Sequence, residues 1–111
     1  MCGIAGILAF SSSTSVAETE LVRLNDAMPH RGPDGVGTWL SEDRKIGLSH
    51  RRLAIVDLTL DAAQPMTDAD GSVQLTYNGE IYNHLALRAE LEAAGHTFRT
   101  DHSDSEVLVH G

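Results

Sequence analysis

The sequence is poor in residues on which several protein classes depend. Its 111 residues include one cysteine, three prolines, one tryptophan, two tyrosines and two phenylalanines. A single cysteine cannot form an internal disulfide, so we expect a reducing, cytoplasmic setting. The apolar stretch at residues 2–10 lacks the basic leader of a secretory signal. No apolar run approaches the length needed to cross a bilayer, so we expect no membrane association.

Positive charge is also scarce. Eight Lys and Arg residues stand against 16 Asp and Glu residues, for a net charge of −8. This balance argues against nucleic acids and anionic membranes as partners, because both require clustered Lys and Arg. The six histidines show no spacing that puts two on one helical face, so we expect no metal site. No glycine-rich segment opens a helix as a phosphate-binding loop does, so we expect no ATP site.

What the sequence does contain suits one small domain. An apolar fraction of 41% and a charged fraction of 22% are ordinary for a folded protein. At this length the chain can bury a single, modest core. Alternation and apolar runs predict strands at residues 3–10, 36–40, 46–49 and 72–77, with Trp39 in the core. The predicted fold class is therefore α+β.

Two helices and the start of a third are expected from capping signals. Ser15 and Glu18 form a potential capping box for a helix that Pro29 ends. Asn83 is a candidate cap for a second helix, which Gly95 ends. A further capping box, Ser103 with Glu106, predicts a short last helix. That helix stops at residue 111 while the chain is still apolar, which indicates a part of a larger domain.

The cysteine stands at position 2, where it has two interpretations. As a nucleophile it must ionise, and a free thiol does so only near pH 8.5. Removal of Met1 would give Cys2 a free α-amino group. The pKa of such a group is about 7.7–8.0, which suits a base at neutral pH. Cys2 could then supply both the nucleophile and its base. Alternatively, Cys2 is a small buried hydrophobe beside Ile4 and Ile7. The residues alone leave both interpretations open.

Asn78-Gly79 directly follows the predicted strand 72–77. An Asn side-chain amide and a Gly backbone N–H can both stabilise an oxyanion, each contributing about 3 kcal/mol in the transition state. However, Asn-Gly between apolar stretches is also the strongest short hairpin signal. Local sequence favours the hairpin.

Three charged residues are candidates for binding the ends of an amino acid. Arg51 and Arg52 could each hold a carboxylate through a planar two-pronged contact, although a solvated pair at a strand end is the more common situation. Asp104 could accept a substrate ammonium, although an acid at the start of a helix is also favoured by the helix dipole alone.

Six segments taken together resemble the amino-terminal glutaminase domain of glutamine-hydrolysing asparagine synthetases. The resemblance covers essentially residues 2–111, and its motifs lie at residues 1–6, 30–35, 50–57, 64–66, 77–83 and 103–106. Cys-Gly-Ile at residues 2–4 marks the wider class of amino-terminal-nucleophile amidotransferases. Arg-Gly-Pro-Asp at residues 31–34 and Arg-Leu-Ala-Ile-Val-Asp at residues 52–57 resemble the asparagine synthetases specifically.

The resemblance implies a role for each candidate residue. Cys2 would attack the side-chain amide of glutamine, and Asn78 with Gly79 would form the oxyanion hole, against the local preference for a hairpin. Arg52 would hold the α-carboxylate, with Arg51 on the surface. The α-ammonium would bind Glu80 and Asp104. The pocket would be lined by Leu53, Ile55 and Val56.

The resemblance also implies a fold and a context. The family fold is a four-layer α/β/β/α arrangement with two antiparallel sheets, of which residues 1–111 would form the first part. Ammonia would pass to a synthetase domain, normally in the same chain, that uses ATP and Mg²⁺ to activate aspartate. No cofactor is expected in residues 1–111, and the full-length enzyme could form a homodimer.

Two other hypotheses stay open at this point. The chain could belong to an amidotransferase that feeds a different acceptor, which residues beyond 111 would decide. It could also be a non-catalytic module that needs a complementing chain, as its abrupt apolar end suggests.

Overall fold

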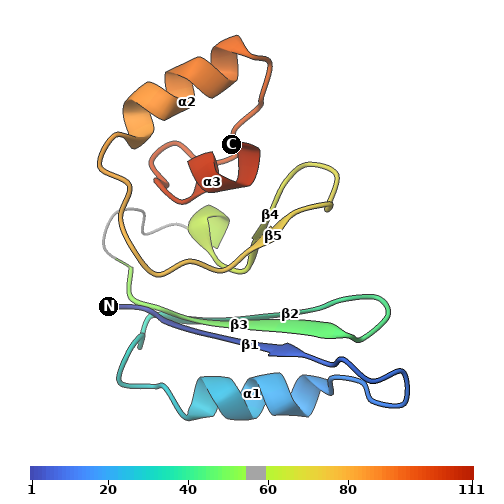
Figure 1. The fold of residues 1–111 in the computed structure, drawn as a ribbon. Helices are drawn as coiled ribbons and strands as arrows, with labels where there is room; N and C mark the ends of the chain where they lie inside the picture. Colours follow the sequence, from blue (N-terminus) through green and yellow to red (C-terminus); the bar gives the residue numbers. More distant parts are fainter. Residues whose placement is uncertain (55–59) are drawn as a thin grey trace.

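The computed structural model describes residues 1–54 and 60–111. It has mixed α and β structure with two antiparallel sheets, as the sequence predicts. In Figure 1 the helix α1 lies below a three-stranded sheet, a smaller sheet lies above it, and α2 and α3 form the top. No helix in the described ranges is long and apolar enough to cross a membrane.

The three-stranded sheet is the most regular part of the molecule. It contains β1 (Gly3–Leu8), β2 (Gly35–Leu40) and β3 (Ile46–Arg52), with β3 in the centre and antiparallel to both neighbours. All three predicted strands are confirmed. The strand β3 continues beyond residue 49, where the prediction ended, through Arg51 and Arg52. Trp39, predicted in the core, is only half-buried.

The helix α1 (Glu18–Asp26) covers one face of this sheet. Leu21 and Val16 are fully buried, and they pack so closely on β3 at Gly47 that a Cβ there would lie 2.7 Å from Leu21. The predicted cap is wrong, because the helix begins after Ala17 rather than Ser15. Glu20, and not Glu18, accepts a hydrogen bond from the N–H of the residue before the helix, Ala17, at 2.8 Å, so both the cap and its acid lie two residues further along the chain than predicted.

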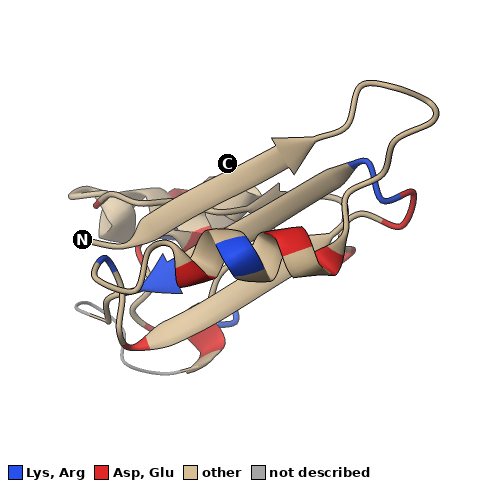
Figure 2. Ribbon diagram, turned by 90° about the horizontal axis from the view of Figure 1, so that it is seen from below, with Lys and Arg blue, Asp and Glu red and all other residues tan. Residues whose placement is uncertain are grey.

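Most of the charges of α1 follow its dipole. Figure 2 views the sheet from the α1 side, with acidic residues at both ends of the helix and a basic residue between them. Glu18 and Glu20 lie in the first turn and Arg23 in the last, where each is favoured by the partial charges of the helix ends. Asp26, the last residue of the helix, is not favoured in this way, but its carboxylate lies 3.7 Å from the Arg51 guanidinium.

The second sheet has only two residues in each strand. It pairs β4 (Met66–Thr67) with β5 (Gln74–Leu75), and a short 3₁₀ turn, η1 (Leu60–Ala62), precedes it. Asp68 closes the connecting turn by accepting hydrogen bonds from the Val73 N–H and the Ser72 hydroxyl. The predicted strand at residues 72–77 is therefore mostly irregular. The hairpin at Asn78-Gly79 is wrong, because the next element is a helix.

That helix, α2 (His84–Ala93), ends as the sequence predicts. Gly95 has a φ of 99°, a left-handed conformation that favours glycine, and its N–H donates to the Glu92 carbonyl at 3.0 Å. At the other end Asn83 precedes the helix, but its side chain makes no capping hydrogen bond.

The last helix is α3 (Glu106–His110). Its predicted capping box is wrong, because the Glu106 carboxylate turns toward the Arg99 and Thr100 backbone instead of Ser103.

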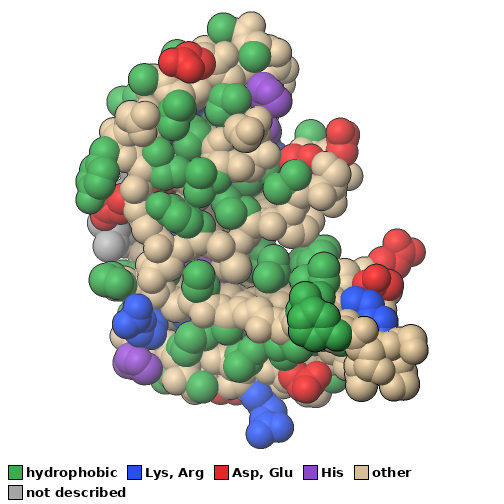
Figure 3. All heavy atoms as spheres, viewed as in Figure 1, with side chains coloured by type: hydrophobic (Ala, Val, Ile, Leu, Met, Phe, Trp, Pro, Cys, Tyr) green, Lys and Arg blue, Asp and Glu red, His purple; other side chains and the backbone are tan. Residues whose placement is uncertain are grey.

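One face of the large sheet carries exposed apolar side chains. Ile4 and Leu8 on β1 and Ile46 on β3 share this face, which points away from α1, and they are 45%, 53% and 42% exposed. In Figure 3 hydrophobic side chains border the notch between the β2–β3 turn and the β4–β5 turn.

Candidate active site

A cavity of about 320 Å³ lies where the ends of β1 and β3 meet the segments that follow β5 and precede α3. Seven of the predicted site residues line it: Cys2, Arg52, Leu53, Asn78, Gly79, Glu80 and Asp104. The remaining two, Ile55 and Val56, lie outside the described residues. The fold therefore gathers, in one place, candidates that are up to 102 positions apart in the sequence.

Cys2 is placed by the pairing of β1 with β3. Gly3 lies opposite Arg51 in the register, so the residue before it reaches the end of β3. There the Cys2 Sγ accepts a hydrogen bond from the Leu53 N–H at 3.3 Å and lies 3.7 Å from the Leu53 carbonyl oxygen. The thiol is thus half-buried, has a defined direction, and faces the cavity.

The two adjacent arginines point to opposite faces of the sheet, because side chains alternate along a strand. Arg51 faces α1, where its Nε donates to the Asn25 carbonyl at 2.9 Å and its guanidinium lies 3.7 Å from Asp26. Its side chain is only 15% exposed, so the expectation of a surface arginine is wrong. Arg52 is half-buried on the cavity side.

The loop at residues 30–34 fixes the end of β3. A Cβ on Gly32 would lie 2.5 Å from the Arg51 carbonyl carbon, so only glycine allows this close backbone approach. Asp34 then bonds on both sides: its N–H donates to the Arg52 carbonyl at 3.0 Å, and its carboxylate accepts from the Ala54 N–H at 2.9 Å. These two hydrogen bonds therefore anchor the segment that carries Arg52 and Leu53 in addition to the pairing of β3 with β2.

Asp104 forms the opposite wall. It is 8% exposed, and its Oδ2 accepts a hydrogen bond from the Ile81 N–H at 2.7 Å. Its Oδ1 is 3.5 Å from the Ser105 hydroxyl. A carboxylate with this limited set of partners retains capacity to accept a further donor from the cavity. Glu80, by contrast, is exposed at the rim.

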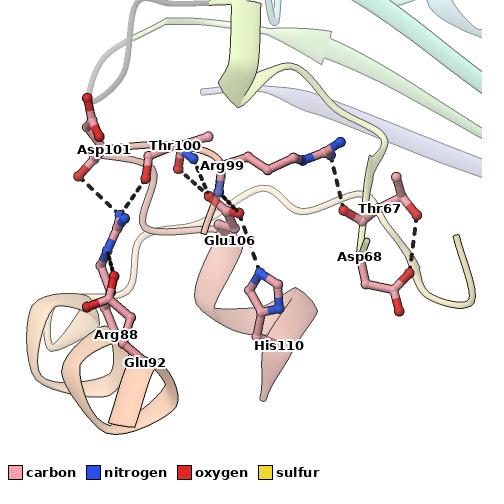
Figure 4. A network of polar contacts seen from close by, with 9 residues as sticks. All are labelled: Thr67, Asp68, Arg88, Glu92, Arg99, Thr100, Asp101, Glu106 and His110. Atoms are coloured by element: carbon pink, nitrogen blue, oxygen red, sulfur yellow. Dashed lines mark hydrogen bonds and ion pairs between the residues drawn. The ribbon is translucent and has the colours of Figure 1, made fainter. Parts of the chain in front are cut away.

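The position of Asp104 depends on a polar network centred on Glu106 (Figure 4). The Glu106 carboxylate, 3% exposed, accepts hydrogen bonds from the Arg99 N–H at 2.7 Å and the Thr100 N–H at 2.8 Å. Burial raises the pKa of Glu106, but these hydrogen bonds, with those from the Thr100 hydroxyl and His110, outweigh it and leave the pKa below its usual value. The network ties residues 99–100 to the start of α3.

His50 lines the cavity as well, although the sequence did not single it out. It is 2% exposed, and among the described residues its Nε2 has no hydrogen-bond partner. Burial lowers its pKa, the Tyr77 backbone partly opposes this shift, and the charge of Arg52 lowers the pKa slightly further. The imidazole is therefore neutral at pH 7. Alternation along β3 was the available signal, because it places His50 and Arg52 on one face.

The other lining residues were also missed as site residues. They are Met1, Ala54, Ala62, Gln64, Tyr77, Tyr82, Ser103 and Ser105. All except Ala62 lie within the segments that carry the resemblance, which was the available signal, although it assigned them no role.

A thiol, a guanidinium and two carboxylates around one small cavity are suited to an amino acid, and comparisons with known proteins agree with this chemistry. A family model described as the glutamine amidotransferase domain matches residues 1–111. The chain belongs to this family.

Relatives of this glutamine amidotransferase domain include three asparagine synthetases of the glutamine-hydrolysing type. The chain is 46% identical to a probable one from Dictyostelium discoideum, over 99% of its own length and 19% of the relative's. It is 40% identical to one from Bacillus subtilis, over 98% of the chain and 17% of the relative. A third, from Arabidopsis thaliana, is 43% identical over 99% of the chain and 18% of the relative.

These relatives confirm the resemblance seen in the sequence. The amidotransferase chain corresponds to the amino-terminal glutaminase portion of this asparagine synthetase family. It spans less than a fifth of the length of the three relatives it matches.

Proposed function

We propose that this chain hydrolyses the side-chain amide of glutamine to give glutamate and ammonia, with Cys2 as the nucleophile. The observation that supports this most strongly is the single cavity shared by Cys2, Arg52, Asn78, Gly79 and Asp104. A free amino acid carries a carboxylate and an ammonium. Arg52 suits the carboxylate, and Asp104, with Glu80 at the rim, suits the ammonium.

The protein matures by loss of Met1, which is 72% exposed and thus accessible to an aminopeptidase. The reaction then proceeds from the mature chain. The freed α-amine of Cys2 takes the proton from the thiol, and the sulfur attacks the amide carbon. The carbonyl electron pair moves to oxygen, where the Asn78 side-chain amide and the Gly79 N–H stabilise it.

Collapse of this intermediate completes the first half of the reaction. The C–N bond breaks, the α-ammonium of Cys2 gives its proton to the departing nitrogen, and ammonia leaves behind a γ-glutamyl thioester. Water, activated by the same amine, then attacks the thioester. The C–S bond breaks, the proton returns to sulfur, and glutamate is released. One water is consumed for each ammonia formed.

The larger context is part of the same proposal. Residues 1–111 form the first part of a four-layer α/β/β/α amino-terminal-nucleophile fold, and the arrangement of α1, the two sheets and the upper helices supports this. The ammonia serves a synthetase domain elsewhere in the full protein, which uses ATP and Mg²⁺ to form asparagine from aspartate. The length of the relatives supports a further domain of this kind.

The test is covalent labelling of the full gene product with a glutamine analogue that carries a diazoketone in place of the amide. We expect one adduct, on a peptide that starts at Cys2 without Met1, and protection by excess glutamine. Cys2→Ala should abolish both the adduct and ammonia release. Retention of Met1, or labelling elsewhere with ammonia release intact in Cys2→Ala, would contradict the proposal.

A further inference from the structure

The segment that carries Asn78 and Gly79 has little backbone support of its own. The strand β5 ends at Leu75 and α2 begins at His84. Within the described ranges, no backbone–backbone hydrogen bond involves residues 76–80. Donors for an oxyanion must be held rigidly, because a displacement of about 1 Å can reduce a rate 100-fold. Another part of the molecule must therefore hold this segment.

We propose that Gln64 is a positioning residue that holds the oxyanion donors through the backbone of Tyr77; this inference rests on the function proposed above. The Gln64 Oε1 accepts a hydrogen bond from the Tyr77 N–H at 2.5 Å, across 13 residues of sequence. Tyr77 immediately precedes Asn78, and Gln64 itself lines the cavity. The side chain of Gln64 thus replaces the hydrogen bond that a neighbouring strand would supply.

Gln64 can do this because its own backbone is fixed against the large sheet. Its carbonyl oxygen occupies the space that a side chain would take at Gly37 on β2, and its carbonyl carbon would lie 2.9 Å from a Cβ there. Gln64 is therefore a rigid link from β2 to the segment that follows β5.

The contact continues from Tyr77 to the oxyanion donors. The Tyr77 ring fills the space beside Gly79, where a Cβ would collide with the phenol oxygen and lie 2.6 Å from Cζ. Gln64 therefore holds the backbone of Tyr77, and the ring of Tyr77 packs against Gly79, so the direction of the next two residues is set from the large sheet.

This arrangement predicts an effect on turnover rather than on substrate affinity. The α-carboxylate and α-ammonium are bound by Arg52 and Asp104, and neither contacts Gln64 by hydrogen bonding among the described residues. Loss of the Gln64 hydrogen bond should therefore reduce kcat for glutamine hydrolysis while KM changes little, which is the signature of an interaction made in the transition state.

The test compares three variants of the full gene product. Gln64→Leu removes the acceptor at similar volume, and Gln64→Glu retains one. Gln74→Leu is the matched control. Gln74 lies on β5, does not line the cavity, and donates from its Nε2 to the Thr67 hydroxyl at 2.9 Å. We expect kcat to fall about 10- to 100-fold in Gln64→Leu. It should recover most of that loss in Gln64→Glu and change little in Gln74→Leu.

Hydrogen exchange of the peptide that covers residues 76–80 provides a second readout. It should quicken in Gln64→Leu only, with β1 and β3 unchanged. Three outcomes would overturn the inference: an unchanged kcat in Gln64→Leu, an effect on KM alone, or a folded Gln64→Glu as slow as Gln64→Leu. If the wild-type protein itself neither hydrolyses glutamine nor labels at Cys2, the proposed function fails and this inference fails with it. If the wild-type protein hydrolyses glutamine and Gln64→Leu is equally active, only the positioning role of Gln64 is rejected and the proposed function stands.

Discussion

The two halves of the molecule are held together in different ways. Residues 1–54 form three strands in continuous register, with a helix packed on one face. Residues 60–111 contain a sheet of only two residues per strand. Their backbone is held largely by side chains instead: Gln64, Asp104 and Glu106 each accept hydrogen bonds from main-chain N–H groups of other segments.

This difference shows which contacts set the geometry of the site residues. The nucleophile directly precedes β1 in the regular half, where the strand residues are fixed by a ladder of backbone hydrogen bonds. The proposed oxyanion donors and the ammonium-binding acid belong to the irregular half, where single side chains set the geometry. Single substitutions should therefore affect the second half more selectively than the first.

The largest effect is expected where the two halves meet, at Gly37. In Gly37→Ala the new methyl would collide with the Gln64 carbonyl and lie 3.1 Å from Pro65 Cδ. Because the obstacle is backbone, it cannot move aside easily, and we expect a loss of about 3 kcal/mol in the free energy of unfolding. Hydrogen exchange should show the loss mainly in residues 60–111.

Gly6→Ala is the control for this substitution. Its methyl would meet only ordinary contacts, 3.5 Å from the Gly47 carbonyl oxygen and from Leu48. It should be nearly neutral. Equal destabilisation by both variants, spread over both halves, would show that the halves do not unfold separately.

The second largest effect is expected at Glu106. Glu106→Gln replaces a buried carboxylate that accepts hydrogen bonds from two main-chain N–H groups, and we expect a cost of about 2 kcal/mol at pH 7. The pKa of Glu106 is lower in the folded state than the usual value, so its contribution is fully present above the unfolded pKa of about 4.3. It is lost as the pH falls through the folded value.

The measurement is urea unfolding of wild type and Glu106→Gln at pH 7 and pH 3.5. The difference between them should shrink at the lower pH. Glu20→Gln is the matched control in the regular half, because Glu20 is exposed and accepts one main-chain hydrogen bond, from Ala17. Its cost should be about 0.5–1 kcal/mol. A Glu106→Gln variant with the same small cost would contradict the role given to the network.

The same difference explains how much of the fold the sequence could predict. The strands β1, β2 and β3 were found because alternation and turn residues specify them locally. The end of α2 at Gly95 was found because a left-handed residue has a clear preference for glycine. Both capping boxes were wrong, because Glu20 and Glu106 accept hydrogen bonds from backbone groups that no local pattern identified.

The site shows a similar division. Cys2, Arg52 and Asp104 were named from the sequence, with the resemblance supplying their roles, and the structure places them around one cavity. Those roles remain predictions. Gln64 lies in one of the segments that carry the resemblance, but it was given no role, because its partner is 13 residues away and a glutamine has no preferred partner in sequence. The contact of Arg51 with α1 was not predicted either. The predicted strand ended at residue 49, so alternation was not applied to Arg51.

The smallest effects are expected on α2, where Arg88 joins the helix to the segment before Asp104. The Arg88 Nη1 donates to the Thr100 and Asp101 carbonyls, its Nε bonds Glu92 at 3.0 Å, and its guanidinium lies 4.5 Å from the centre of the Phe98 ring. Lysine has no planar fork to make these contacts together, so Arg88→Lys should cost about 1 kcal/mol. Glu92→Gln removes only the half-exposed ion pair and should cost about 0.3–0.5 kcal/mol.

Salt distinguishes the two substitutions. The Glu92 contribution should disappear in urea melts at about 1 M salt, where screening acts over roughly 3 Å, while most of the Arg88→Lys cost should persist because its carbonyl contacts are partly buried. If both costs vanish with salt, Arg88 acts only as a surface charge, and the segment that leads to Asp104 is held by Glu106 alone. If the Arg88→Lys cost persists, side chains from both α2 and α3 fix this wall of the cavity. The irregular half then depends on several independent side-chain contacts rather than on hydrogen bonds between paired strands.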